Sequence, residues 1–225
     1  MKLVLKPGAS QIRDLELIIG LGQARIEEAL AHLENTGPLD SLRPGILAAK
    51  LESVLGAEQA GILAKQLVSL FGVKSDTGAT GQEVISAVAD ALRAAGSTSV
   101  EDWHAVGKTL KSLLELPSVR IAANSIKLIY DHDRLLSDIR IISDIRPLFD
   151  DDGENIQGGI ISFALKIRSD GIDGRKEDTY ALDQKDVETL RLQCERALKK
   201  ADTSKEFLTK TGVPAIITGE PAENG

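Results

Sequence analysis

Cysteine is almost absent from this chain: Cys194 is the only one, so no disulfide can form within the chain. The opening stretch "MKLVLKPGAS" has an apolar run that is too short for a secretory signal. No run approaches the roughly 20 apolar residues that a membrane-spanning helix needs. These absences predict a protein of the reducing cytoplasm with no membrane span.

A surplus of basic residues is absent too, since 27 Lys and Arg face 34 Asp and Glu and the formal net charge is −7. General nucleic-acid binders usually have the opposite balance, so nucleic acid is not expected as a partner. The hydrophobic fraction of 42% is ordinary for a folded protein and argues against a disordered chain. A chain of 225 residues is long enough for two modest domains.

Apolar residues recur at helical spacing throughout the first half of the chain. The first helical stretch has Ser10 as its expected N-cap and a break or kink at Gly20 and Gly22. The stretch "GVKSDTGATG", residues 72–81, has little to bury and predicts a mobile loop. Trp103 lies at helical spacing among apolar residues and is expected in a core. We expect about six helices in this half.

The spacing of apolar residues changes from about 3.6 to 2 near Asp133. "RIISDIRPLF" (140–149) and "GGIISFALKIRSDG" (158–171) alternate strictly, and the turn "SDGIDGRKE" leads to a third strand around 178–182. The predicted fold class is therefore α+β, with an N-terminal all-helical domain, a three-stranded antiparallel sheet and an amphipathic helix. The expected boundaries are a helical domain at 1–132, a small sheet-and-helix domain at 133–212 and a flexible tail at 213–225.

The stretch that follows the third strand, "LDQKDVETLRLQCERALKKA", predicts an amphipathic helix. Asp183 is its expected N-cap, and Asp186 stands three residues later, which is close to a capping box. Cys194 falls on the apolar stripe of this helix, which favours a small buried apolar residue over a nucleophile. A separate short helix is expected at 204–211, before Pro214.

Two polar stretches invite a metal-site interpretation. "YDHDR" places His132 between two aspartates, but zinc sites usually need three or four converging donors, so a solvated loop is favoured. "DDDGEN" fails the calcium-loop pattern, because taking Gly153 as the sixth position puts Leu148 at the first and Gly159 at the twelfth. With no nucleophile, acid and base set in view either, we expect no enzyme, no catalytic residue, no cofactor and no metal.

The order of elements in the second half resembles that of the COMM domain proteins, as a distant or bacterial-type relative. The likeness covers roughly residues 135–201: a strand with Pro147, a second strand at 160–168, a hairpin with Asp170 and Gly171, a third strand and a helix from Asp183. The resemblance implies a homodimer or heterodimer interlocked through the sheets. It also implies a scaffold for protein–protein interaction in place of an enzyme.

The residues point to oligomerisation independently of that resemblance. A unit of about 70 residues supports only a marginal core, and one helix covers only one face of a sheet. Each buried Ile, Leu or Phe contributes about 1.5–3 kcal/mol, so a second copy of the chain would solve the problem of covering the sheet. The predicted dimer interface consists of Ile139, Ile141, Ile145, Ile161, Phe163, Leu165 and Ile167.

The strand positions that alternate with the apolar ones are mostly polar, and they support an alternative function. Four basic residues fall on these positions and could form an anion site or acidic-partner face: Arg140, Arg146, Lys166 and Arg168. The other interpretation is that these four residues are ordinary solvated strand residues whose positive charge is balanced by Asp138 and Asp144. Two hypotheses therefore stay open, an assembly protein that binds itself and further protein partners, and a module that binds RNA or another polyanion.

Overall fold

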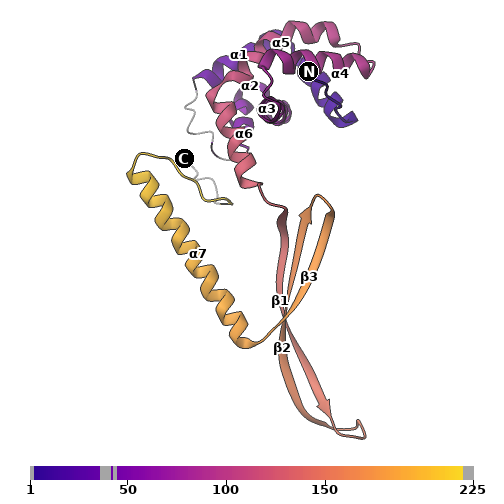
Figure 1. Ribbon diagram of the computed structural model, residues 1–225, viewed down its shortest axis with the longest axis vertical. Coiled ribbons are helices and arrows are strands. Elements are labelled where there is room, and N and C mark those ends of the chain that lie inside the picture. Colours follow the sequence, from indigo (N-terminus) through magenta and orange to yellow (C-terminus); the bar gives the residue numbers. More distant parts are fainter. Residues whose placement is uncertain (1–2, 36–41, 43–44, 220–225) are drawn as a thin grey trace. The chain divides into compact units, whose positions relative to one another are not determined.

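The computed structural model describes residues 3–35, 42 and 45–219, and the chain forms two compact units, residues 1–129 and 130–225 (Figure 1). The first unit is helical within the described residues, and the second contains a three-stranded antiparallel sheet and one long helix. The α+β class predicted from the sequence is confirmed. The helices of the first unit are α1 (Ala9–Glu34), α2 (Ile46–Leu55), α3 (Ala57–Thr77), α4 (Gly81–Ala94), α5 (Val100–Glu115) and α6 (Pro117–Ile129).

The first helical stretch bends where its glycines predicted. Gly22 interrupts α1 with φ 77° and ψ 161°, a backbone conformation that only glycine adopts without strain. The helix starts at Ala9, so Ser10 is not its cap. The N–H of Gly8 instead donates to Oε1 of Gln11 at 3.0 Å and satisfies one end group of the helix.

The helical unit has one continuous hydrophobic core. Trp103 of α5 is completely buried, as expected, and its indole Nε1 donates to the backbone oxygen of Ile85 at 3.0 Å. That bond matters because a buried N–H without a partner would destabilise the fold. The fully buried side chains of the helical unit also include Ile26, Leu33, Leu51, Leu63, Leu67, Leu92, Leu110, Leu113, Leu114, Val84 and Val88.

The prediction of a loop at 72–81 is mostly wrong, because α3 continues to Thr77 and only three residues separate it from α4. Tertiary contacts hold the polar end of α3 in place: Lys74 Nζ pairs with Glu115 Oε2 at 2.6 Å, and Asp76 Oδ1 accepts from Lys127 Nζ at 2.7 Å. The helix ends at Gly78, which has φ 68°. The composition of this stretch resembles a loop because its polar side chains lie on the solvent side of a helix.

The sheet of the second unit has the strand order β1-β2-β3, with β1 (Arg134–Phe149), β2 (Ile156–Gly171) and β3 (Gly174–Leu182). Both neighbouring pairs are antiparallel. Only Ile172 and Asp173 connect β2 to β3, and Gly174 supplies the positive φ, 94°, that this tight turn requires. β3 therefore begins four residues before the position expected from the sequence.

The strands have different lengths, which leaves part of the sheet two-stranded. β2 pairs with β1 from Ile156 to Gly171, but β3 pairs only with residues 163–171 of β2. Figure 1 shows β1 and β2 continuing beyond β3 as a ribbon. Irregular register breaks the β1–β2 ladder twice, near Ser137 and near Gln157.

The last helix, α7 (Gln184–Lys210), begins with the expected capping box. Asp183 Oδ1 accepts from the N–H of Asp186 at 2.8 Å, and the Asp183 N–H donates to Asp186 Oδ2 at 3.0 Å. The prediction of a separate helix at 204–211 is wrong, because α7 is continuous to Lys210. Of the expected tail, residues 213–219 form no helix or strand, and residues 220–225 lie outside the described residues.

Candidate functional site

The seven apolar residues of the predicted interface all lie on one face of the sheet, which we call the apolar sheet face. The register places Ile139 opposite Ile167, Ile141 opposite Leu165 and Ile145 opposite Ile161. Residues opposite one another in a ladder point to the same side, and alternate residues of a strand share a face. Phe163 stands opposite Ser143 and belongs to the same set.

Much of this face is open to solvent. The side chains of Ile139, Ile141, Ile145 and Ile161 are 55%, 47%, 70% and 66% exposed. Phe163 and Ile167 are half-buried. Leu165 is the only apolar residue of the second unit that is buried, as far as the structure describes that unit.

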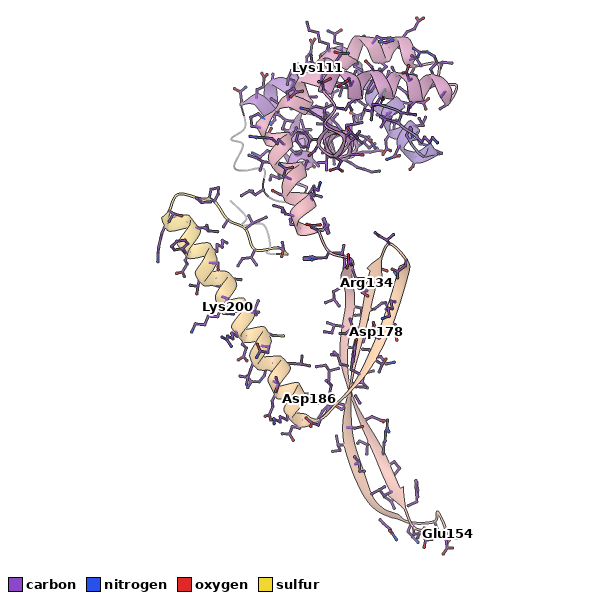
Figure 2. All side chains as sticks on the ribbon, viewed as in Figure 1. Lys111, Arg134, Glu154, Asp178, Asp186 and Lys200 are labelled. Carbon is purple, nitrogen blue, oxygen red and sulfur yellow. The ribbon has the colours of Figure 1, made fainter. Side chains whose placement is uncertain are left out.

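Within the described part of the second unit, α7 leaves most of the apolar sheet face uncovered. None of the residues of α7 is buried, and Leu192, Leu198 and Phe207 of this helix are 53%, 66% and 65% exposed. Cys194 is exposed as well, so the prediction that it is buried is wrong for a single chain. Figure 2 shows the contrast between the crowded side chains of the helical unit and the separate side chains along the strands and α7.

Sequence reasoning missed several exposed apolar residues of the sheet, among them Tyr180, Ile142 and Ile160. Tyr180 of β3 stands opposite Leu165 and extends the apolar sheet face; it is 51% exposed. Ile142 and Ile160 lie on the opposite face and are 42% and 53% exposed. The alternation of β3 could have revealed Tyr180. Ile142 and Ile160 belong to the runs "II" at 141–142 and 160–161, where one isoleucine must face each side.

The four basic residues of the alternative site also share one face, opposite to the apolar one. In the strand register, Arg140 stands opposite Lys166, and Arg168 stands opposite Asp138. Each arginine has an acidic partner on this face. The contacts are Arg140 Nε to Asp138 Oδ2 at 3.1 Å, Arg146 Nε to Asp144 Oδ2 at 3.1 Å, and Arg168 Nη2 to Glu177 Oε2 at 2.9 Å.

These ion pairs neutralise most of the positive charge that the strand pattern predicted. The hydrogen bond from Arg168 to Glu177 also raises the pKa of the arginine, with the nearby Asp138 acting in the same direction. Of the four basic residues on this face, only Lys166 has no carboxylate partner among the described residues. The face is a mixture of alternating charges, which differs from the continuous basic surface that tracks a nucleic-acid backbone.

The loop between β1 and β2 uses one of its acidic groups internally. The carboxylate of Asp150 accepts from the N–H groups of Glu154 and Asn155 at 2.9 and 3.2 Å and from Nδ2 of Asn155 at 2.8 Å. These bonds, chiefly those from Asn155, hold the pKa of Asp150 below its ordinary value. Within the described ranges, no three His, Cys, Asp or Glu side chains lie close enough together to hold a metal ion, and His132 belongs to no such group.

The helical unit contains an apolar cavity of about 300 Å³ between α2, α3 and α6. Its lining is made mostly of small and aliphatic residues, with Lys65 as the only titratable side chain. Such a cavity offers no convergent polar groups to orient a substrate. Its lining residues are Gly45, Leu47, Ala48, Gly61, Ala64, Lys65, Val68, Ala122 and Ile126.

Comparison of the chain with protein-family models and with curated proteins finds no match in either. None of the helices in the described part of the chain combines the length and the apolar character needed to cross a membrane.

Proposed function

We propose that this protein is a non-enzymatic assembly protein that associates with itself through the sheet of residues 134–182 and presents its helical unit to other proteins. The observation that carries the proposal is the lack of a core in the second unit, where Leu165 alone is buried among the described apolar residues. A sheet with one buried side chain does not fold stably by itself. A second copy supplies the missing cover.

The distribution of exposed apolar side chains supports the same proposal. Of the large hydrophobic residues that are exposed in the described chain, all but Val4, Leu17 and Leu128 lie in the second unit. Monomeric proteins rarely leave large contiguous apolar patches open to water, and such patches usually mark an interface. The helical unit, by contrast, buries its own core.

Burial energies indicate how much of the surface has to be used. The four isoleucines with about half of their area or more exposed would each contribute roughly 0.8–1.5 kcal/mol when covered, or about 6–12 kcal/mol in a two-fold dimer. Association itself costs about 4–15 kcal/mol. The apolar sheet face alone therefore gives at best a weak dimer. A stable assembly also needs the apolar residues of α7, namely Leu192, Leu198 and Phe207.

The resemblance to COMM domain proteins favours this proposal, since that family assembles through the corresponding sheet. The proposal places the protein in the cytoplasm, where a single unpaired cysteine is common. It includes no cofactor, and the ion-paired arginines give no specific support to the polyanion alternative.

Light scattering on the purified protein tests the proposal. Wild-type protein at micromolar concentration should have at least twice the monomer mass of 24.1 kDa. Ile141→Asp should weaken association by at least about 100-fold, because it places an unpaired charge in a buried interface. Ile142→Asp is the matched control, since Ile142 is adjacent and similarly exposed but points to the other face. A monomeric wild type with a folded sheet would contradict the proposal.

A further inference from the structure

One edge of the sheet lacks the usual protection against pairing with another strand. β3 ends at Leu182, opposite Phe163, because the capping box at Asp183 turns the chain into α7. The β2 residues before Phe163 therefore have β1 on one side and no strand on the other. Between the irregular register near Gln157 and Phe163, this free edge runs regularly over residues 158–162 with the sequence GGIIS.

The other two edges of the sheet are protected. Exposed edges usually carry charges, prolines or bulges that prevent pairing with another strand. The outer edge of β1 has Pro147, irregular register near Ser137 and four charged residues from Asp138 to Arg146. β3 has four consecutive charged residues at 175–178. The segment 158–162 has no charge and no proline, and its Ile160 and Ile161 are 53% and 66% exposed.

The side chains of this segment are complementary to a second copy of itself. If two copies pair antiparallel about a two-fold axis at Ile160, Gly159 stands opposite the partner's Ile161 and Gly158 opposite the partner's Ser162. The absence of a side chain at each glycine leaves room for the larger side chain of the other chain. A two-fold axis also closes the assembly, so the edge does not propagate into a fibre.

We propose that the free edge of β2, residues 158–162, pairs antiparallel with the same edge of a second copy and joins the two sheets into one. This inference rests on the proposed self-association and names the backbone contact that accompanies the covering of the apolar faces. Five facing residue pairs supply about four to six inter-chain hydrogen bonds. The two apolar sheet faces then lie on the same side of a continuous sheet, where the apolar residues of two α7 helices can cover them.

A cysteine cross-linking experiment tests the register in the full-length chain with Cys194→Ser. Ile160→Cys should form a disulfide-linked dimer under mild oxidation, because directly opposed residues have Cα atoms about 5 Å apart, within disulfide reach. Ile161→Cys is the control. It is the more exposed position, but across the proposed axis its two copies are about 8 Å apart and should cross-link at least about tenfold more slowly. Faster cross-linking at Ile161 than at Ile160 would overturn the proposed pairing.

Residue-resolved hydrogen exchange separates this inference from the self-association on which it rests. In the wild-type assembly, the alternate amides of residues 158–162 that point away from β1 should exchange at least about 100-fold more slowly than the amides on the unpaired outer edge of β1 in the same molecule. Open-edge exchange rates in a protein that is dimeric by light scattering would refute the edge pairing and leave self-association standing. A wild-type monomer would refute both.

Discussion

Protein concentration should stabilise the second unit and leave the first unchanged. Unfolding of a dimer releases two chains, so each tenfold increase in concentration adds about 1.4 kcal/mol to the apparent free energy of unfolding. The helical unit buries its own core, whereas the second unit buries only Leu165 among the apolar residues that the structure describes. Only the second unit should respond to concentration.

Two spectroscopic probes separate the units during urea unfolding. Trp103 is the only tryptophan and lies in the core of the helical unit, so its fluorescence reports on that unit alone. Far-ultraviolet circular dichroism reports on both. With an m value of about 2 kcal/mol/M, the dichroism transition of the second unit should move by about 1.4 M urea between 1 and 100 μM protein. The fluorescence midpoint should not move.

A core variant calibrates the assignment of the two transitions. Leu113→Ala removes a fully buried side chain of α5 and should destabilise the helical unit by about 2–5 kcal/mol. It should lower the fluorescence midpoint and leave the concentration-dependent transition in place. A single transition that both probes follow, at a midpoint independent of concentration, would refute the argument that the second unit depends on a partner.

Two further predictions concern charged groups. The hydrogen bond from Lys65, at 2.9 Å, is the main cause that holds the pKa of Asp14 below its ordinary value of 3.8, and Gln66 donates to the same oxygen. Asp14→Asn should therefore cost the helical unit about 1–2 kcal/mol at pH 7. Because a lowered pKa contributes stability above the unfolded value, the difference in unfolding free energy should disappear as the pH falls through the pKa of folded Asp14; a constant difference would contradict this. Titration with single-stranded RNA at physiological salt should show negligible binding, and salt-sensitive, sub-micromolar binding that Arg140→Glu with Lys166→Glu abolishes would favour the polyanion alternative.

The sequence predicted the sheet faces well because strand alternation is a local property. Each of the residues at 139, 141 and 145 lies on the face that its phase indicates, and the register pairs them with the matching phase of β2. The capping box at Asp183 was predictable for the same reason, since it needs only two residues three positions apart. Local patterns of this kind survive in the fold whatever surrounds them.

Two of the errors come from polar residues in helices. Thr203 and Ser204 resemble a helix boundary in the sequence, yet α7 passes through them and Thr203 Oγ1 donates to the backbone oxygen of Lys199 at 2.9 Å. That bond satisfies the hydroxyl inside the helix, where the sequence predicted the start of a separate helix. The polar end of α3 was misjudged similarly, because its support comes from Glu115 and Lys127, which are distant in the sequence.

Periodicity shows which face of an element is apolar, but it does not show what covers that face. In the helical unit the covering residues belong to the same chain, and Trp103 is buried as its spacing predicts. Cys194 and most isoleucines of the apolar sheet face have equally clear apolar spacing but are exposed. The difference is that α7 and the apolar sheet face do not bury each other. These elements have the apolar spacing of buried residues but stay exposed in the single chain. This mismatch is the physical reason to propose that a second chain covers them.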